Sequence, residues 1–171
     1  MMKKSKGFTL IELMVVVVIL GILAVVVAPR IPDLVKKAKE GATKGSLSTL
    51  RSTLNIYYSD TEGVYPATHW STTGVTPTAE GQPLSSPPDV LSIALVPKYI
   101  KAIPAAKVPT AHAQDSTTVY YFYTIPKSTS TAESNSGFGW AYGSVYGTND
   151  YGQVVVNCSH TDTGGNNWVG Y

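Results

Sequence analysis

Cysteine is nearly absent from this chain of 171 residues, in which Cys158 is the only one. A single cysteine excludes an internal disulfide, and with it the disulfide frameworks that hold many small exported domains together. Any folded domain in this chain is therefore expected to be held by packing or by a bound ion. The default interpretation of Cys158 is a buried, small apolar side chain, and an intermolecular bridge is the alternative.

Charge is missing from a long stretch near the N-terminus. Residues 8–28 contain no Lys, Arg or Asp, and Glu12 is their single ionisable side chain. As a helix these residues would extend about 32 Å, enough to cross the hydrocarbon core of a bilayer. We therefore predict a membrane-spanning helix. Lys3, Lys4 and Lys6 precede it, which predicts that the leader stays in the cytoplasm while the rest of the chain is exported.

Glu12 is a costly residue for that segment. A carboxylate in hydrocarbon costs at least about 2.5–3.5 kcal/mol, so a plain anchor would carry an apolar residue there. If the bond after Gly7 is cut, the new α-ammonium of Phe8 lies four residues before Glu12 on the same helix face. Pairing of this amine with Glu12 of the same or a neighbouring copy would set a register for stacked subunits. In the simpler alternative, Glu12 lies at the depth of the lipid headgroups.

Two other interpretations of the N-terminus compete with this one. A conventional secretory signal has an apolar core of about 7–15 residues and a small-residue cleavage site. The core here is longer and contains a carboxylate, and its best small-residue site, Val26-Val27-Ala28, is followed by Pro29. A plain signal-anchor is the second alternative, and it keeps the same orientation in the membrane.

Residues 29–61 are predicted to continue the helix in amphipathic form. Pro29 and Pro32 each remove a backbone donor, which predicts a kink or a melted turn around residues 24–32. Beyond them, apolar residues recur at spacings of three and four up to an end near Ser59. The expected apolar stripe comprises Leu34, Val35, Ala38, Ala42, Leu47, Leu50, Leu54, Tyr57 and Tyr58. The expected opposite face comprises Lys36, Lys37, Lys44 and Arg51.

Residues 62–171 are predicted to form the exported head domain. Gly and Pro punctuate its first part, which predicts an exposed loop over residues 71–86. Before that loop, Val64-Tyr65-Pro66 and Trp70 are expected to pack over the helix. After it, residues 87–96 are expected to form a short helix that has Pro87 and Pro88 at its first turn.

β-branched and aromatic residues predict strands in the second part of the head. These strands are expected at residues 119–125, 138–142 and 153–157, with a polar loop at 127–136 and an added edge strand at 167–169. Turn signals between them favour an antiparallel meander with one face packed on the helix. The predicted fold class is α+β, a long N-terminal helix on a small antiparallel sheet.

The charges are unevenly distributed between stem and head. Residues 30–61 contain six Lys or Arg against three acidic residues, whereas residues 62–171 contain four Lys against seven acidic residues. A basic stem beside an acidic head could stagger neighbouring copies, or the basic residues could simply follow headgroup electrostatics. No concentrated basic face is predicted, so the sequence does not indicate nucleic-acid binding.

Candidate metal and catalytic residues are sparse. Asp150 and Asp162 lie in polar turns that could offer calcium some of the six to eight oxygens it prefers, although polar turns without metal are the simpler interpretation. Cys158 and His160 supply only two zinc ligands, and no base–orienter pair accompanies the thiol. His69 and His112 are expected in polar loops. We therefore predict neither an enzyme nor a required cofactor.

Tyrosine is abundant, with eleven residues in the chain. A tyrosine-rich sheet could bind sugars or surfaces by stacking. Most of these residues are better explained as strand residues that have an apolar ring and a polar handle.

The N-terminal segment resembles the signal of type IV pilins and type II secretion pseudopilins. The basic leader comprises residues 1–7. Its last residue begins the motif Gly7-Phe8-Thr9-Leu10-Ile11-Glu12, which matches the family residue by residue. Gly21 and Pro29 fall where the family's helix-loosening Gly and Pro lie, and the resemblance extends to about Tyr58. It implies that a prepilin peptidase cuts after Gly7 and methylates the Phe8 amine.

The resemblance also implies a location and partners. The chain would wait in the inner membrane with its head on the periplasmic side, and it would then enter an extracellular filament made of copies of itself or mixed subunits. Its helper proteins would be a membrane platform protein and an assembly ATPase.

Three functions follow as alternatives: a type IV pilus subunit, a type II secretion pseudopilin, and a monomeric membrane-anchored binding domain. Many type IV pilins pin their C-terminal loop with a disulfide, and its absence here favours the pseudopilin. The lack of an Asp-Pro-Trp-Gly-type segment argues against the commonest major pseudopilin. In that pseudopilin the C-terminal loop binds calcium. The monomeric domain would need no processing.

Overall fold

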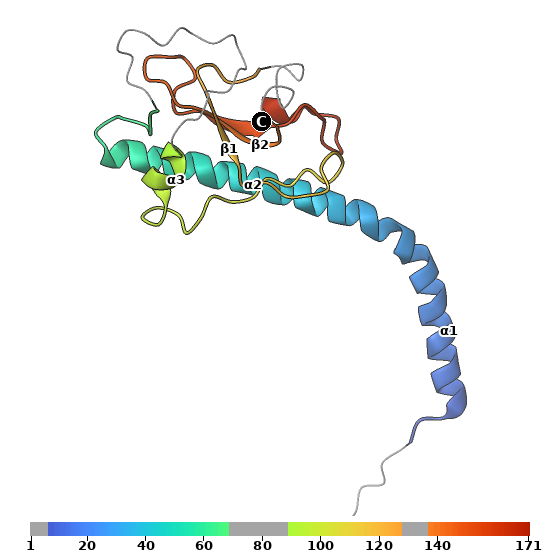
Figure 1. The fold of residues 1–171 in the computed structure, drawn as a ribbon. Helices are drawn as coiled ribbons and strands as arrows, with labels where there is room; N and C mark the ends of the chain where they lie inside the picture. The colour runs from blue at the N-terminus through green and yellow to red at the C-terminus, as the bar shows by residue number, and fades with distance from the viewer. Residues whose placement is uncertain (1–6, 69–88, 128–136) are drawn as a thin grey trace, which may run out of the picture. The chain divides into compact units, whose positions relative to one another are not determined.

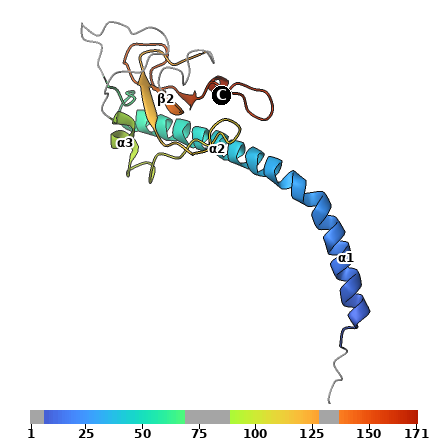
Figure 2. The same cartoon turned by 45° about the vertical axis from the view of Figure 1, so that its right-hand side comes forward.

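The computed structural model describes residues 7–68, 89–127 and 137–171 (Figures 1 and 2). Several predicted features lie outside these residues: most of the leader, His69, Trp70, the loop at 71–86, Pro87, Pro88 and most of the loop at 127–136. The chain divides into two compact units, residues 1–35 and residues 36–171. They are described separately.

The first unit is helical. Helix α1 (Leu10–Val27) passes into a short 3-10 turn, η1 (Ala28–Arg30), and helix α2 (Ile31–Asp60) follows at once. Thr9 is the N-cap of α1, and the cap residue at its end, Ala28, still donates its N–H to the Ala24 carbonyl. The 3-10 turn occurs where Pro29 removes a backbone donor from the helical ladder.

In the second unit, α2 supplies one wall of the core. The predicted apolar stripe is confirmed at Leu47, Leu50 and Leu54, which are all buried, and the helix ends at Asp60, close to the predicted end. The stripe is wrong nearer the N-terminus, because its members from Leu34 to Ala42 are exposed. Glu40 and Thr43 are the buried residues there.

Hydrogen-bond partners explain why Glu40 and Thr43 are buried in this part of α2. The Glu40 carboxylate accepts hydrogen bonds from the backbone N–H (3.0 Å) and the hydroxyl (2.6 Å) of Thr163. The Thr43 hydroxyl accepts from the backbone N–H of Lys107 and donates to its carbonyl, both at 2.7 Å. Burying a polar group is tolerated when it is hydrogen-bonded in this way, and an apolar pattern cannot reveal such positions.

The sheet contains three strands, β1 (Val119–Phe122), β2 (Gly139–Gly143) and β3 (Val154–Asn157), in the order β1-β2-β3. The prediction of three strands in these regions is confirmed, and so is the α+β class. Strands β2 and β3 pair antiparallel as expected, with Trp140 opposite Val156.

The predicted antiparallel meander is wrong for the other pair, because β1 and β2 run parallel, with Val119 opposite Trp140. The sheet is therefore mixed. Parallel neighbours need a crossover of a dozen or more residues, and residues 123–138, which link these two strands, are long enough to provide one.

Both faces of the sheet are buried. One face contributes side chains such as Trp140, Tyr142 and Val156 to the main core, which they share with Leu50 of α2. Figures 1 and 2 show the sheet on one side of α2. The other face forms a smaller cluster of Phe122, Ile125, Ala141, Val155 and Val169.

Two short helical segments close the head. Helix α3 (Val90–Leu95) confirms the predicted short helix but begins later than residue 87, because Asp89 is its N-cap and accepts a hydrogen bond from the Ser92 N–H. The predicted edge strand at 167–169 is wrong, because Trp168–Gly170 forms a 3-10 turn, η2. Trp168 joins the main core and Val169 joins the smaller cluster, so the turn places two neighbouring side chains in different clusters.

Several tyrosines combine a packed ring with a hydrogen-bonded hydroxyl, as the sequence predicts. Tyr65 packs against Tyr58 of α2, with ring centroids 4.5 Å apart. Inside the core, the Tyr142 hydroxyl donates to the Pro66 carbonyl, and burial raises the pKa of Tyr142 far above its usual range. Burial likewise raises the pKa of Tyr151 to about 12, and its hydroxyl donates to the Tyr65 carbonyl.

Candidate functional site

Helix α1 exposes an unusually apolar surface. Among the described residues none of its side chains is buried, and Phe8 just before it is 86% exposed. By length and composition, the continuous helical stretch from residue 10 to 60 contains a segment that could cross a membrane. Burying one Val, Leu or Ile side chain stabilises by about 1.5–3 kcal/mol, so this surface strongly favours lipid or other helices over water.

Glu12 lies in the first turn of α1 and forms a capping box with Thr9. Its carboxylate accepts hydrogen bonds from the Thr9 backbone N–H (2.8 Å) and hydroxyl (2.7 Å), and its own N–H donates to the Thr9 hydroxyl (3.3 Å). Two N–H groups at the helix start, which have no partner within the helix, are thereby satisfied. Our sequence analysis missed this role, although Thr-x-x-Glu before an apolar run is its recognised signature.

The other residues predicted in this segment are accessible. Gly7 and Phe8 precede the helix and are exposed, which leaves the bond between them open to a peptidase. A Cβ added at Gly21 would meet nothing within 4 Å. Pro29 lies in η1 and Pro32 in the first turn of α2. Cleavage, methylation, Glu12 pairing and the kink stay predictions.

In the head, Asp162 forms an ion pair with α2. Its carboxylate accepts hydrogen bonds from the Lys44 ammonium (2.8 Å) and the Tyr171 hydroxyl (2.5 Å), and the N–H groups of Gly164 and Asn166 donate to its other oxygen. These donors, Lys44 first, hold the pKa of Asp162 far below its usual range. Asp162 in turn raises the pKa of Lys44.

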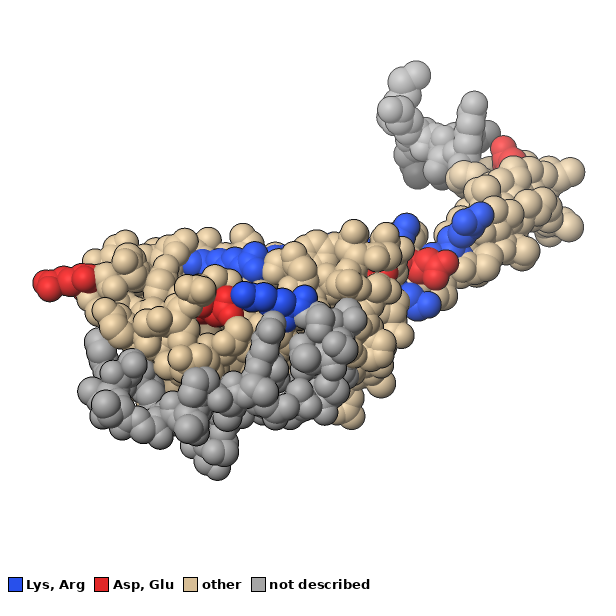
Figure 3. All heavy atoms as spheres, turned by 90° about the horizontal axis from the view of Figure 1, so that it is seen from above, with Lys and Arg blue, Asp and Glu red and all other residues tan. Residues whose placement is uncertain are grey.

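Two residues predicted on the outer face of α2 therefore turn toward the head. Besides Lys44, the Arg51 guanidinium donates to the Val154 carbonyl at 3.0 Å and to the Tyr171 carbonyl at 2.6 Å. Long basic side chains can lay their apolar stems along a surface and reach distant acceptors, which a helical wheel does not show. On the face in Figure 3 the basic side chains lie in separate groups, and acidic side chains lie beside several of them.

The two candidate calcium residues are both buried and already have partners. Asp150 accepts a hydrogen bond from the Ile125 N–H at 3.1 Å and pairs with the Lys127 ammonium at 3.4 Å. Asp162 has the Lys44 partner described above. A calcium ion at either position would have to displace a lysine, and calcium binding stays a prediction.

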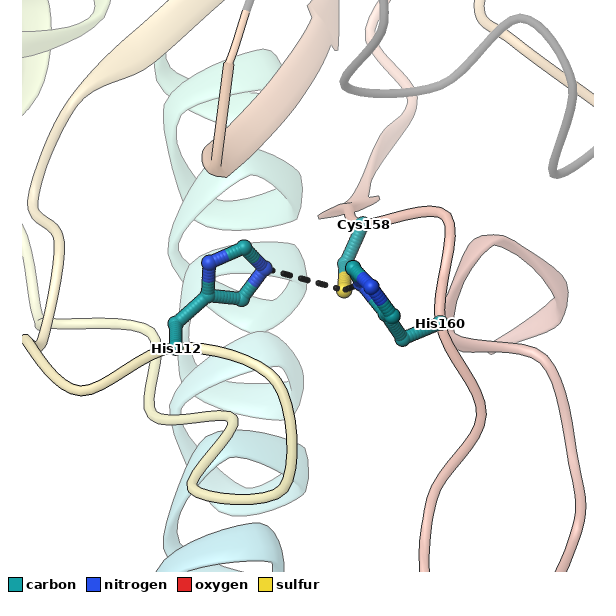
Figure 4. Close-up of side chains that lie close together, drawn as sticks. All are labelled: His112, Cys158 and His160. Carbon is teal, nitrogen blue, oxygen red and sulfur yellow. Dashed lines mark hydrogen bonds between the residues drawn. The ribbon is translucent and has the colours of Figure 1, made fainter.

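Cys158 is buried, as predicted, but it has neighbours that the sequence did not reveal. Its sulfur lies 3.6 Å from Nε2 of His112 and 3.5 Å from Nδ1 of His160 (Figure 4). The Cys158-x-His160 spacing could be read from the sequence, whereas His112 lies 46 residues away and was expected only in a polar loop. Within the described residues, these three form a group of potential metal ligands.

The family described as the prokaryotic N-terminal methylation motif matches residues 2–28. The chain is 44% identical over 66 residues to the type II secretion system core protein G of Pseudomonas aeruginosa, which is 39% of this chain and 46% of that protein. No solved structure matches the chain.

Two pilus proteins are similar to the chain over stretches of comparable length. Identity is 37% over 82 residues with the fimbrial protein EcpC of Eikenella corrodens, covering 48% of this chain and 52% of that protein. It is 38% over 61 residues with the type IV narrow pilus major component PilA5 of Thermus thermophilus, covering 36% and 53%. The chain thus spans about half the length of the curated relatives it matches.

Fold and sequence together define a protein with an exposed apolar N-terminal helix, which has one carboxylate near its start, and a small α+β head. At residues 2–28 the chain carries the prokaryotic N-terminal methylation motif, and it is similar to type IV pilus proteins and to a type II secretion core protein.

Proposed function

We propose that this chain is a structural subunit of a type IV pilus-like filament, processed after Gly7 and assembled through its N-terminal helix. The observation that carries this proposal is the exposed apolar surface of α1 with Glu12 in its first turn. A plain anchor needs the apolar surface but not the carboxylate. A filament subunit uses both. Its apolar surface exchanges lipid for neighbouring helices, and its carboxylate meets the Phe8 amine in the fibre core.

The subunit would wait in the inner membrane with residues 8–28 spanning it and its head in the periplasm. A prepilin peptidase would remove the leader and methylate the Phe8 amine, and a membrane platform protein and an assembly ATPase would drive assembly. The helix would then lie in the fibre core, where the Phe8 amine of one subunit meets Glu12. This role is structural, and it requires no catalytic group or cofactor.

A second candidate, the type II secretion pseudopilin, is supported by the similarity to core protein G. A pseudopilus would stay short and periplasmic and would act in protein export. The similarity to EcpC and PilA5 supports the pilus equally. The shared N-terminal motif serves both machines, so the location of the assembled filament is the property that separates them.

The test is the mass of the N-terminal peptide, measured separately in the fraction sheared from cell surfaces and in the membrane fraction. A methylated peptide that begins at Phe8 in the sheared fraction supports the pilus subunit. The same peptide found only in membranes supports the pseudopilin. An unprocessed N-terminus in every fraction would overturn both and would leave a membrane-anchored binding domain.

A further inference from the structure

Three side chains with nitrogen or sulfur ligand atoms converge at one point of the head. Cys158 directly follows strand β3, and His160 lies two residues further along. His112 comes from a separate loop on the other side of the sulfur, so the thiol lies between two imidazole rings (Figure 4). One ligand atom from each residue lies within 4.8 Å of the other two.

The spacing matches what a single zinc ion requires. Zn–S and Zn–N bonds of about 2.3 and 2.0–2.1 Å at a tetrahedral angle place sulfur and nitrogen about 3.5–3.6 Å apart. The observed Cys158 sulfur lies 3.6 Å from His112 Nε2 and 3.5 Å from His160 Nδ1. A tetrahedral ion needs its two nitrogens about 3.3 Å apart, and in the structure the ligand atoms lie within 4.8 Å of one another. The exposed His160 ring is the one with room to adjust when the ion binds.

The surrounding structure holds these residues in place. The His112 ring stacks on Phe138, with centroids 4.0 Å apart and planes 5° from parallel. Its backbone N–H donates to the Val108 carbonyl, which closes a turn. Cys158 is fully buried in the main core, and the carbonyl of His160 accepts a hydrogen bond from the Trp168 N–H. Pre-positioned ligands lose little conformational entropy when a metal binds.

We propose that His112, Cys158 and His160 form a zinc site whose fourth position is taken by water. One thiolate and two imidazoles are ligands that favour Zn²⁺ or copper, whereas Ca²⁺ and Mg²⁺ prefer oxygen. The thiol loses its proton to solvent on binding, and the two imidazoles bind in neutral form. The exposed His160 leaves one side of the site accessible to water.

The site would act as a staple in a head whose single cysteine excludes a disulfide. It joins the loop that contains His112 to the segment after β3, where Cys158 lies 46 positions further along the sequence. Metal binding of this kind stabilises the folded state, because the unfolded chain lacks the assembled site.

The test uses the full chain in detergent, freed of metal with a chelator and titrated with Zn²⁺ and then with Co²⁺ as a spectroscopic probe. We expect one ion per chain, a thiolate-to-cobalt charge-transfer band, and a melting temperature that falls when the chelator is present. His160→Ala should weaken Zn²⁺ binding by at least roughly 10–100-fold, the loss seen even when only an outer-shell partner is removed. Because His160 is exposed, this variant should still fold.

Two further variants sharpen the result. His160→Cys restores a ligand and should recover most of the affinity. Asp115→Asn changes a carboxylate in the same loop as His112 that pairs with Lys107, and it should leave Zn²⁺ binding unchanged. Equal Zn²⁺ affinity of the original chain and His160→Ala, a cobalt spectrum without the thiolate band, or binding of copper(I) without any zinc would each overturn the assignment.

Discussion

Lys44 and Asp162 join the long helix to the C-terminal part of the head through a hydrogen-bonded ion pair of 2.8 Å. The Asp162 side chain is only 4% exposed, whereas that of Lys44 is 38% exposed. Tyr171 contacts both, because its hydroxyl bonds to Asp162 and its ring lies under the Lys44 ammonium, 4.0 Å from it. The pair therefore fastens residues 162–171 onto α2.

Lys44→Met should destabilise the head by about 2 kcal/mol, because it leaves the Asp162 carboxylate buried without its cation. Denaturant unfolding of the full chain in detergent, followed by tryptophan fluorescence, measures the change. Lys98→Met is the matched control, since Lys98 forms an exposed pair with Asp60, and it should cost less than about 1 kcal/mol. Equal effects of the two variants would contradict the structural role of Lys44.

The same pair predicts a pH dependence. The pKa of Asp162 is lower in the folded chain than in the unfolded chain, so its contribution is fully present above the unfolded value of about 3.9 and is lost as the pH falls through the folded value. The difference in unfolding free energy between the original chain and Asp162→Asn should therefore be constant near neutral pH and shrink below about pH 4. Unfolding curves from pH 7 to pH 2 test this, and a difference that grows on acidification would contradict it.

Gly143→Ala should destabilise the sheet by about 1–3 kcal/mol or more. A Cβ at Gly143 would collide with the backbone carbonyl of Asp150, and rigid backbone cannot move aside as a flexible side chain can. Gly45→Ala is the opposite case, because its Cβ would meet nothing within 4 Å in the middle of α2. That variant should stabilise the helix by about 0.5–1 kcal/mol. Melting temperatures that move in the same direction for both variants would refute this prediction.

Glu12→Val should keep membrane insertion and disrupt filament assembly, because it removes the proposed partner of the Phe8 amine. It also removes the capping box, so Thr9→Val is the necessary comparison. Thr9→Val loses the cap, worth about 1 kcal/mol, but keeps the carboxylate, and it should still assemble. Cell fractionation measures insertion, and the amount of sheared filament measures assembly. Normal filaments from Glu12→Val would rule out the pairing, and equal loss in both variants would assign Glu12 to capping alone.

Gly7→Leu should block removal of the leader, because a large side chain replaces hydrogen next to the bond that is cut. Intact-protein mass spectrometry of the membrane fraction should then show only the unprocessed chain. Gly21→Leu places the same side chain in the middle of α1 and should leave processing unchanged. If Gly7→Leu were still processed, its mature chain would have the same mass as the mature original chain. That result would refute the proposed cleavage site.

The sequence predicted local elements better than their pairing. Helix α2, helix α3 and the three strands follow from apolar periodicity and β-branched runs, which are properties of neighbouring residues. The direction of β1 relative to β2 depends on the path of residues 123–138, and composition gives no direction for it. Only the length of that link indicated a crossover.

The candidate sites show the same division. Glu12 was predicted to be special because a charge in an apolar run is visible in one segment, and its cap with Thr9 was also readable there. His112 was missed because its neighbours Cys158 and His160 are distant in sequence and are brought close only by folding. The contacts of Lys44 and Arg51 with the head were missed because their long side chains reach beyond the face on which their Cα atoms lie.

The buried polar residues of α2 have a mechanical consequence. Glu40 holds Thr163, and Thr43 exchanges two hydrogen bonds with Lys107, so the helix has one fixed axial position against the head. A slide by one turn would break these hydrogen bonds, because it would put Lys36 or Lys44 in the place of Glu40. A force directed along the axis of α2 would act on several of these bonds at once in shear, together with the Lys44–Asp162 pair. The described parts of the head would therefore move with α2 under tension, without slip between helix and head.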